Sequence, residues 1–294
     1  MNRHEFISLV GVMPAKPDDY HIETLEMVDC GTYNRHKLAY DVEIGERITA
    51  YVCIPKYIEG KVPGIFCHHQ HNGEFHLGKS EVVGLVGNPE QAYAAELAER
   101  GYVTFASDAL AFEDRNWHDE PFLAEAYEGT ARISSGTTFM AKLLHDISIG
   151  IDILSGISEV DGNQIGFIGH SYGGKMAFWA AAYDRRIRAA VANCGSTSLR
   201  RSLEKDAGIL PELTIPGFLQ HGDVVDVAKL ADAAILISGT TDDVWSEDGQ
   251  ELYDGLMQDS KDAELRLYDD VHCFREDMRK YAYDFLNRKL ALGK

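Results

Sequence analysis

Residues 166–175 read GFIGHSYGGK, a run that places Ser171 between two glycines. Before it, residues 164–168 (QIGFI) have the length and apolar content of a short buried strand, and residues 176–182 (MAFWAAA) after it are rich in helix formers. A nucleophile elbow needs this strand, sharp turn and helix, because its serine adopts a strained backbone conformation that flanking side chains would obstruct. The run therefore indicates an α/β fold with Ser171 as a nucleophile.

A G-x-S-x-G pentapeptide also arises by chance, so this interpretation depends on a base and an acid later in the chain. In such folds the partners follow in the order Ser, Asp, His, each after its own strand. Residues 234–238 (AILIS) predict a buried strand that leads into Asp242 and Asp243, and residues 264–268 (ELRLY) predict a half-buried strand that leads into His272. Because parallel strands gather reactive groups at their carboxyl ends, His272 stands out among the twelve histidines.

With these pieces in order, residues 35–292 resemble the α/β-hydrolase superfamily, in particular its dienelactone-hydrolase-like and acetyl-esterase-like branch. The resemblance implies a mostly parallel central sheet with an antiparallel N-terminal edge and helices on both faces. Members usually carry their acid at G-x-x-D, which favours Asp242 over Asp243 as the residue that orients His272. The implied catalytic residues are thus Ser171, Asp242 and His272.

The resemblance also implies an activity: hydrolysis of small carboxylic esters, of the acetyl ester or lactone type, through a covalent ester on the elbow serine. Relatives place an oxyanion hole at an H-G pair after the third strand, and here the pair reads His69-Gln70. This departure changes the expected shape of the loop. The expected oxyanion donors are the backbone N–H groups of Gln70 and Tyr172.

Two long stretches, residues 109–136 and 194–226, are predicted to be irregular insertions. They either cover the serine as a lid or pad the edge of the sheet, and aromatic-rich loops near strand ends often line pockets. The candidate substrate-binding residues are His69, Phe112, Arg115 and Trp245. Arg115 has a second interpretation, as an anchor of the first insertion that pairs with a carboxylate.

Two other functions compete with ester hydrolysis. Residues 73–80 (GEFHLGKS) fit the phosphate-binding pattern G-x-x-x-x-G-K-S of nucleotide-binding proteins, but residues 81–89 (EVVGLVGNP) carry two glycines and a proline where the helix of such a site must run. GHSYGG also resembles the catalytic domain of prolyl-oligopeptidase-like peptidases, which ordinarily depend on an added propeller. About 60 residues precede the first parallel strand, too few for the blades of a propeller.

A run of histidines invites a metal-site interpretation, since imidazole is a common transition-metal ligand. Its members are His68, His69, His71 and His76. The neighbouring Cys67 and Glu74 stand at no recognised ligand spacing, so histidines at the mouth of a pocket are the preferred interpretation. No metal and no cofactor are predicted.

The composition predicts one soluble domain over residues 1–294, with residues 1–34 as an N-terminal extension. A net charge of −19 argues against a nucleic-acid partner, because phosphate binding needs a basic surface. Five cysteines without C-x-x-C spacing favour a reducing compartment, and no stretch approaches the roughly 20 apolar residues of a membrane span. The cytoplasm and a small-molecule ester partner are expected, and the oligomeric state stays open, a homodimer included.

Overall fold

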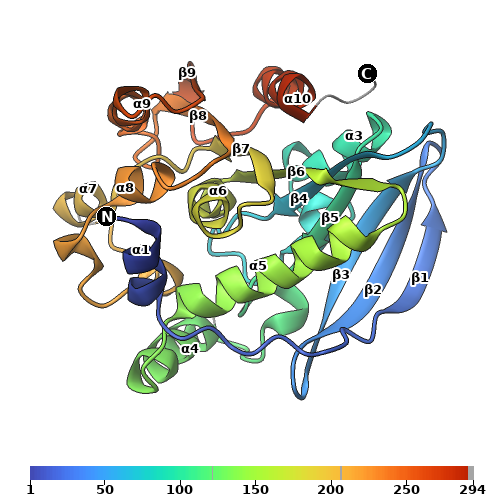
Figure 1. Cartoon of the computed structure of the whole chain (residues 1–294), viewed down its shortest axis with the longest axis horizontal. Helices are drawn as coiled ribbons and strands as arrows, with labels where there is room; N and C mark the ends of the chain where they lie inside the picture. The colour runs from blue at the N-terminus through green and yellow to red at the C-terminus, as the bar shows by residue number, and fades with distance from the viewer. Residues whose placement is uncertain (121, 206, 291–294) are drawn as a thin grey trace.

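The computed structural model describes residues 1–120, 122–205 and 207–290. Its strands are β1 (Glu23–Asp29), β2 (Tyr33–Glu43), β3 (Glu46–Pro55), β4 (Val62–His68), β5 (Val103–Ser107), β6 (Val160–His170), β7 (Ile187–Asn193), β8 (Ala234–Asp242) and β9 (Ala263–Val271). They form a nine-stranded sheet in the order β1-β2-β3-β5-β4-β6-β7-β8-β9. Figure 1 shows it running from blue β1 at one side of the molecule to red β9 at the other.

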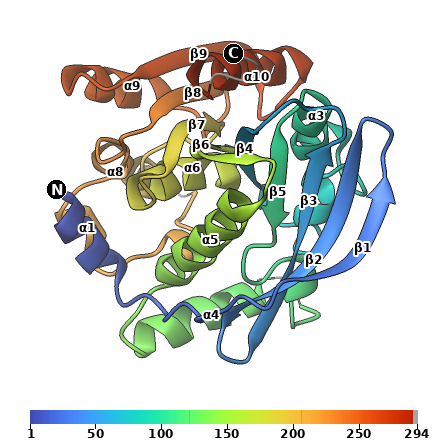
Figure 2. The same ribbon diagram turned by 45° about the vertical axis from the view of Figure 1, so that its right-hand side comes forward.

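The helices cover both faces of this sheet. They are α1 (Arg3–Val10), α2 (Lys79–Val82), α3 (Tyr93–Glu99), α4 (Leu123–Ser134), α5 (Phe139–Gly156), α6 (Tyr172–Tyr183), α7 (Leu199–Glu204), α8 (Val224–Ala228), α9 (Gly249–Gln258) and α10 (Glu276–Leu290). Helices α1, α5, α6, α8 and α9 share one apolar core, and α3 and α10 belong to the core of the opposite face (Figure 2). Short 3-10 turns are η1 (Pro89–Gln91), η2 (Glu113–Arg115), η3 (Pro211–Leu213) and η4 (Phe218–Gln220).

Strand direction confirms the fold predicted from the sequence. Strands β1, β2, β3 and β5 pair antiparallel in succession, whereas β5, β4, β6, β7, β8 and β9 pair parallel. Every residue of β4 and β5 is buried, as expected for parallel strands covered by helices on both faces. The sheet is therefore mostly parallel with an antiparallel N-terminal edge.

Both predicted insertions contain helical segments where irregular chain was expected. The first holds η2 and α4, and the second holds α7, η3, η4 and the start of α8. Thr138, just after the first insertion, caps α5 by accepting a hydrogen bond from the backbone N–H of Ala141 at 3.0 Å. Residues 121, 206 and 291–294, which fall within the predicted insertions and the predicted 1–294 domain, lie outside the described residues.

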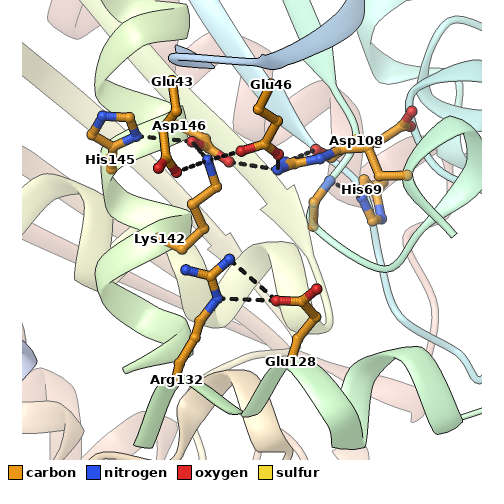
Figure 3. A network of polar contacts seen from close by, with 11 residues as sticks. Glu43, Glu46, His69, Asp108, Glu128, Arg132, Lys142, His145 and Asp146 are labelled. Carbon is orange, nitrogen blue, oxygen red and sulfur yellow. Dashed lines mark hydrogen bonds and ion pairs between the residues drawn. The ribbon is translucent and has the colours of Figure 1, made fainter. Parts of the chain in front are cut away.

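A buried ion network joins α5 to the β2–β3 hairpin (Figure 3). The Lys142 ammonium pairs with Glu43 and Glu46 of the hairpin and, at 2.9 Å, with Asp146 one turn further along α5. Burial opposes ionisation of Asp146, but Arg115 and Lys142 beside it hold the pKa of that carboxyl below its ordinary value. Since each buried charge is matched by opposite charges, the network fixes the position of the hairpin against the helix.

Among the described residues, no helix combines the length and the apolar character of a membrane span.

Close packing between α5 and the sheet gives a first test. We expect Gly150→Ala to lower the free energy of unfolding by about 1–3 kcal/mol, because overpacking a buried site forces its neighbours apart. An added Cβ would lie 2.6 Å from Cε2 of Phe66 and 2.9 Å from Cε1 of Phe105. That cost exceeds the gain in helix propensity of up to about 1 kcal/mol.

Gly156→Ala is the matched control, since an added Cβ there has nothing within 4 Å and only the propensity gain remains. Urea unfolding followed by circular dichroism measures both variants. Equal stability of the two variants would contradict the packing interpretation.

Candidate active site

Ser171 sits at the sharp turn between β6 and α6 with φ 58° and ψ −116°. This left-handed conformation is unfavourable for a residue with a side chain, so the surrounding contacts must impose it. The flanking glycines explain how the chain comes so close: an added Cβ at Gly169 would lie 2.3 Å from the carbonyl carbon of Gly173, and one at Gly173 would lie 2.3 Å from the carbonyl oxygen of His68. The strained turn predicted from G-x-S-x-G is present.

The side chain and backbone of Asn193, the last residue of β7, hold this turn in place. Its carbonyl accepts the Ser171 N–H at 2.8 Å, and its side-chain amide lies 2.8 Å from Nδ1 of His170 and donates to the Cys273 carbonyl at 3.0 Å. Ser238 on β8 donates its hydroxyl to the Asn193 Oδ1 at 2.7 Å. Asn193 therefore links the serine turn, the acid strand and the histidine loop. The sequence reasoning missed it; the available signal was a polar residue ending a buried strand.

The carboxylate beside His272 belongs to Asp243, and the prediction of Asp242 is wrong. Asp243 Oδ2 lies 2.9 Å from the His272 Nδ1, which is an ion-pair distance. The ring and the carboxylate are not aligned for a hydrogen bond. Asp242 is exposed and is still part of β8, where it pairs with Val271 of β9. Side chains alternate between the faces of a strand, so the next residue, not the last strand residue, turns toward the histidine.

Neighbouring hydrogen-bond donors and His272 hold Asp243 as an anion. It accepts hydrogen bonds from the Trp245 N–H at 3.0 Å and the Ser246 hydroxyl at 2.7 Å. Burial opposes its ionisation, but the contact with His272 and these donors lower the pKa of the Asp243 carboxyl overall. The side chain of Asp243 is 2% exposed and that of His272 is 29% exposed, so the imidazole reaches solvent-accessible space while its partner does not.

A cavity of about 280 Å³ opens beside the serine. It is lined by His71, Asn72, Gly73, Phe122, Ser171, Tyr172, Lys175, Cys194, Leu199, Ser202, Gly208, Ile209, Leu210, Leu213, Trp245 and His272. Ser171 and His272 thus face one space. Both insertions contribute to its wall, the first through Phe122 and the second through Cys194, Leu199, Ser202, Gly208, Ile209, Leu210 and Leu213.

Of the four predicted substrate-binding side chains, only Trp245 lines this cavity. Phe112 is fully buried and stacks behind the wall on Phe75. Arg115 pairs with Glu46 at 2.7 Å and Asp146 at 2.8 Å, which confirms its interpretation as an anchor. The structure therefore contradicts substrate contact by Phe112 and Arg115.

The prediction of substrate contact is wrong for His69 as well, because the protein itself uses both of its ring nitrogens. Nδ1 donates to the Gln70 carbonyl at 2.7 Å, and Nε2 accepts from the Ala109 N–H at 3.0 Å. Burial holds the pKa of His69 well below its ordinary value, so the ring is neutral. Its Nδ1 contact orients the peptide group between Gln70 and His71.

The two expected oxyanion donors lie at the serine turn and in the loop after β4. Within the described part of the chain, the backbone N–H groups of Gln70 and Tyr172 enter no backbone hydrogen bond with another segment. The Gln70 side chain points elsewhere and donates to Glu81 Oε2 at 3.1 Å. Tyr172, directly after the serine, lines the cavity. Neither amide therefore has a backbone acceptor among the described residues, and of the two residues only Tyr172 lines the cavity.

Lys175 places an amine in the cavity wall one helical turn after the serine. Its Nζ donates to the Thr197 carbonyl. Burial lowers the pKa of Lys175 to about 8, and the more distant Asp223 and Asp248 oppose that shift. The cavity wall therefore carries a titratable cation.

Three groups of potential metal ligands occur among the described residues. The first group is Cys194, Asp243 and His272, and it includes the ion pair between Asp243 and His272 described above. Asp108, Glu113 and Asp114 form the second, and the ammonium of Lys79 already occupies their centre. His71, Glu125 and Glu212 form the third, a buried group of which His71 also lines the cavity.

The contacts of Lys79 also exclude the nucleotide-binding alternative. Its side chain is fully buried, and Nζ lies 2.7 Å from Asp108, 2.7 Å from Glu113 and 2.9 Å from Asp114. The helix that follows, α2, has only four residues. A phosphate-binding loop needs a free lysine and a helix N-terminus facing the phosphates, and residues 73–80 provide neither.

The strain at Ser171 makes a measurable prediction. We expect Ser171→Gly to raise the free energy of unfolding by about 1 kcal/mol, because relief of about 1–3 kcal/mol of backbone strain outweighs the extra chain entropy of glycine. Ser171→Ala keeps a Cβ, hence the strain, and should unfold with the wild type. If Ser171→Gly unfolds at or below the denaturant midpoint of Ser171→Ala, the turn carries no strain.

Comparisons with known proteins show which sequences and folds this chain is similar to. The Bacillus subtilis (strain 168) protein YtaP is 30% identical over 193 residues, which make up 65% of this chain and 62% of YtaP. Carbohydrate esterase MZ0003, from an unknown prokaryotic organism, is 25% identical over 138 residues, 41% of this chain and 31% of the relative. The chain therefore spans less than two thirds of the length of these relatives.

Among solved structures, the acetyl xylan esterase from Paenibacillus sp. R4 superposes with a TM-score of 0.70 at 19% identity, covering 94% of this chain and 90% of that one. This similarity shows a shared fold. A model of the dienelactone hydrolase family matches residues 79–292, from the buried Lys79 through the serine turn to α10. The chain belongs to the dienelactone hydrolase family and has the α/β-hydrolase fold.

Proposed function

We propose that this protein hydrolyses small carboxylic esters, of the acetyl ester or lactone type, through a covalent ester on Ser171. The observation that carries the proposal is the strained serine turn, which shares one cavity with a histidine paired to a buried carboxylate. Family membership supports a hydrolase, and an esterase among the relatives supports the ester bond as its target.

In the proposed reaction, the Ser171 hydroxyl attacks the acyl carbon while His272 Nε2 accepts its proton. Asp243 holds the ring in the tautomer that leaves Nε2 free, and it stabilises the imidazolium that forms. The tetrahedral intermediate collapses as His272 returns the proton to the leaving alcohol. A water molecule, deprotonated by His272 in turn, then releases the acid from the serine.

The oxyanion of each tetrahedral intermediate would be bound by the backbone N–H groups of Gln70 and Tyr172. The absence of a backbone acceptor for either amide in the described chain supports this role, as does the contact of His68 Nδ1 with the His69 carbonyl at 3.0 Å, because that carbonyl belongs to the peptide group that carries the Gln70 N–H. Donors fixed in advance cost no reorganisation when charge develops, and loss of one typically lowers turnover by about 10²- to 10³-fold.

The cavity supports a small substrate over a peptide. Its volume of about 280 Å³ suits a short acyl group with a compact alcohol. The described strands all belong to one sheet, so the described chain contains no propeller of the kind on which prolyl-oligopeptidase-like peptidases depend. Since both insertions line the cavity, we assign them the role of a cover over the serine.

The first test identifies the nucleophile. A fluorophosphonate probe is expected to add one adduct to the wild type, located by peptide mass spectrometry at Ser171, because this serine sits at the strained turn in the cavity that the proposed base also lines. Ser202 also lines the cavity, so Ser202→Ala is the control and should be labelled at the wild-type rate. Labelling of Ser171→Ala at that rate would disprove the assignment.

The second test separates the two adjacent acids. We expect Asp243→Asn to lower kcat for p-nitrophenyl acetate by about 10⁴-fold, because an amide favours the wrong histidine tautomer. Asp242→Asn should stay within about twofold of the wild type, as an exposed surface change does. A larger loss in Asp242→Asn than in Asp243→Asn would return the orienting role to Asp242.

A further inference from the structure

Behind the cavity wall, one buried contact joins three separate segments of the chain. His71 comes from the loop after β4, Glu125 from α4 in the first insertion and Glu212 from η3 in the second. The side chains of Glu125 and Glu212 are 1% and 0% exposed. His71 Nε2 lies 3.0 Å from Glu125 and 3.9 Å from Glu212.

The hydrogen bonds of His71 settle its protonation. The backbone N–H of Gly73 donates to His71 Nδ1 at 2.9 Å, so Nδ1 is an acceptor and carries no hydrogen. The ring is therefore neutral with its hydrogen on Nε2, which donates to Glu125 Oε1 at 3.0 Å. The histidine brings no positive charge to the two carboxyl groups.

The same tautomer argues against a metal ion among these three residues. A histidine that binds a metal through Nε2 carries its hydrogen on Nδ1 and donates it to an acceptor. Here Nδ1 faces a donor, the Gly73 N–H. The negative charge of the two carboxyl groups must be reduced in another way.

Two adjacent, fully buried carboxyl groups cannot both be ionised without a counter-charge, so one of them holds a proton. The partners decide which one. Glu125 receives the His71 N–H, whereas neither carboxyl oxygen of Glu212 accepts a hydrogen bond from any described donor. Burial, and then the Glu125 carboxyl within 4.8 Å of it, raise the pKa of Glu212 well above its ordinary value, while the pKa of Glu125 is lowered on balance.

We propose that Glu212 is a protonated carboxylic acid at neutral pH and that it donates its proton to the Glu125 carboxylate, thereby fastening the second insertion to the first across the cavity wall. Glu212 is a positioning residue in this proposal, because it touches neither the serine nor the proposed base. The inference goes beyond the proposed ester hydrolysis and does not depend on it.

Other ionisable groups face this contact or its neighbours. The Tyr172 hydroxyl is buried nearby with its pKa raised well above the ordinary value, first by burial and then by Glu212 and Glu125. Helices α4 and α5 pack against η3, and the charged residues Lys142, His145 and Asp146 of α5 are engaged in the separate network with the hairpin. Lys175 titrates in the cavity wall, so alkaline loss of activity by itself does not report on Glu212.

The proposal makes stability depend on pH in a defined direction. In the unfolded chain Glu212 loses its proton near the ordinary value of 4.5, whereas in the folded protein it keeps the proton to higher pH. The folded state then binds one more proton, so the contribution of this group to stability is full below pH 4.5 and falls as pH rises toward the raised folded pKa. Glu212→Gln keeps a hydrogen-bond donor toward Glu125 and removes this dependence.

The experiment is equilibrium urea unfolding of the wild type, Glu212→Gln and Glu204→Gln across a series of pH values from acid to mildly alkaline. The folding constant of Glu212→Gln relative to wild type should rise by about tenfold for each pH unit within the window between the two pKa values. Glu204 lies in the same insertion but is exposed, so the same ratio for Glu204→Gln should stay constant.

Infrared spectroscopy of the native proteins gives a second readout that does not require unfolding. At neutral pH, Glu212→Gln should lose one protonated-carboxyl carbonyl band that the wild type and Glu204→Gln both show. The buried Asp108, whose pKa burial raises to about 7, contributes a separate band in all three proteins. A ratio of folding constants that does not change with pH, or a difference spectrum in which Glu212→Gln loses no protonated-carboxyl band relative to the wild type, would overturn the proposal. The first outcome would mean that Glu212 is ionised and neutralised by a cation.

Discussion

The backbone conformation of Ser171 is the constraint on which the site depends. A residue with a side chain adopts φ 58° only when its neighbours leave no alternative, and here they are backbone atoms of three other segments. Gly169 meets Gly173 across the turn, Gly173 meets the strand β4 at His68, and Gly174 meets the end of β7 at Asn193. The turn thus fixes the spacing of β4, β6, β7 and α6, and in doing so exposes the serine hydroxyl to the cavity.

Asn193 extends that constraint to the rest of the site. Its backbone holds the serine turn, and its side chain reaches the loop that carries the histidine and the strand that leads to the acid. The ring of His170 lies beside that of His272 with centroids 4.6 Å apart, which adds an apolar contact to the same junction. A change at one of these positions is therefore transmitted to the others through short, direct contacts.

Buried charge is the second feature that organises the structure, because its ion pairs fix segments of the chain relative to one another. Lys79, Arg115 and Lys142 are all withdrawn from water, yet each is in contact with at least two carboxylates. Such groups add little net stability, but each partner is costly to remove and so specifies one arrangement. Through them α5 and the first insertion are fixed to the hairpin of β2 and β3, and the Glu125 and Glu212 contact joins the second insertion to this frame.

The sequence determined the features that depend on neighbouring residues. A strand, a Gly-flanked serine and a helix are contiguous, so the nucleophile turn at residues 166–175 was readable, and the order of later strands indicated the fold. Hydrophobic periodicity also predicted that Asp242, Asp243 and His272 follow the ends of strands. The two adjacent aspartates were then the candidates for the partner of His272. These conclusions needed no knowledge of distant contacts.

The tertiary structure decided everything that depends on where a strand stops and what lies beyond it. Strand β8 extends through Asp242, whose side chain is exposed, and the next residue, Asp243, lies beside His272, because side chains alternate along a strand. Whether an aromatic or charged side chain lines a cavity or supports its wall depends on packing between remote segments, which is why Trp245 reaches the cavity and Phe112 does not. The protonation of Glu212 has the same origin, since only folding brings Glu125 and His71 from two other segments to its side.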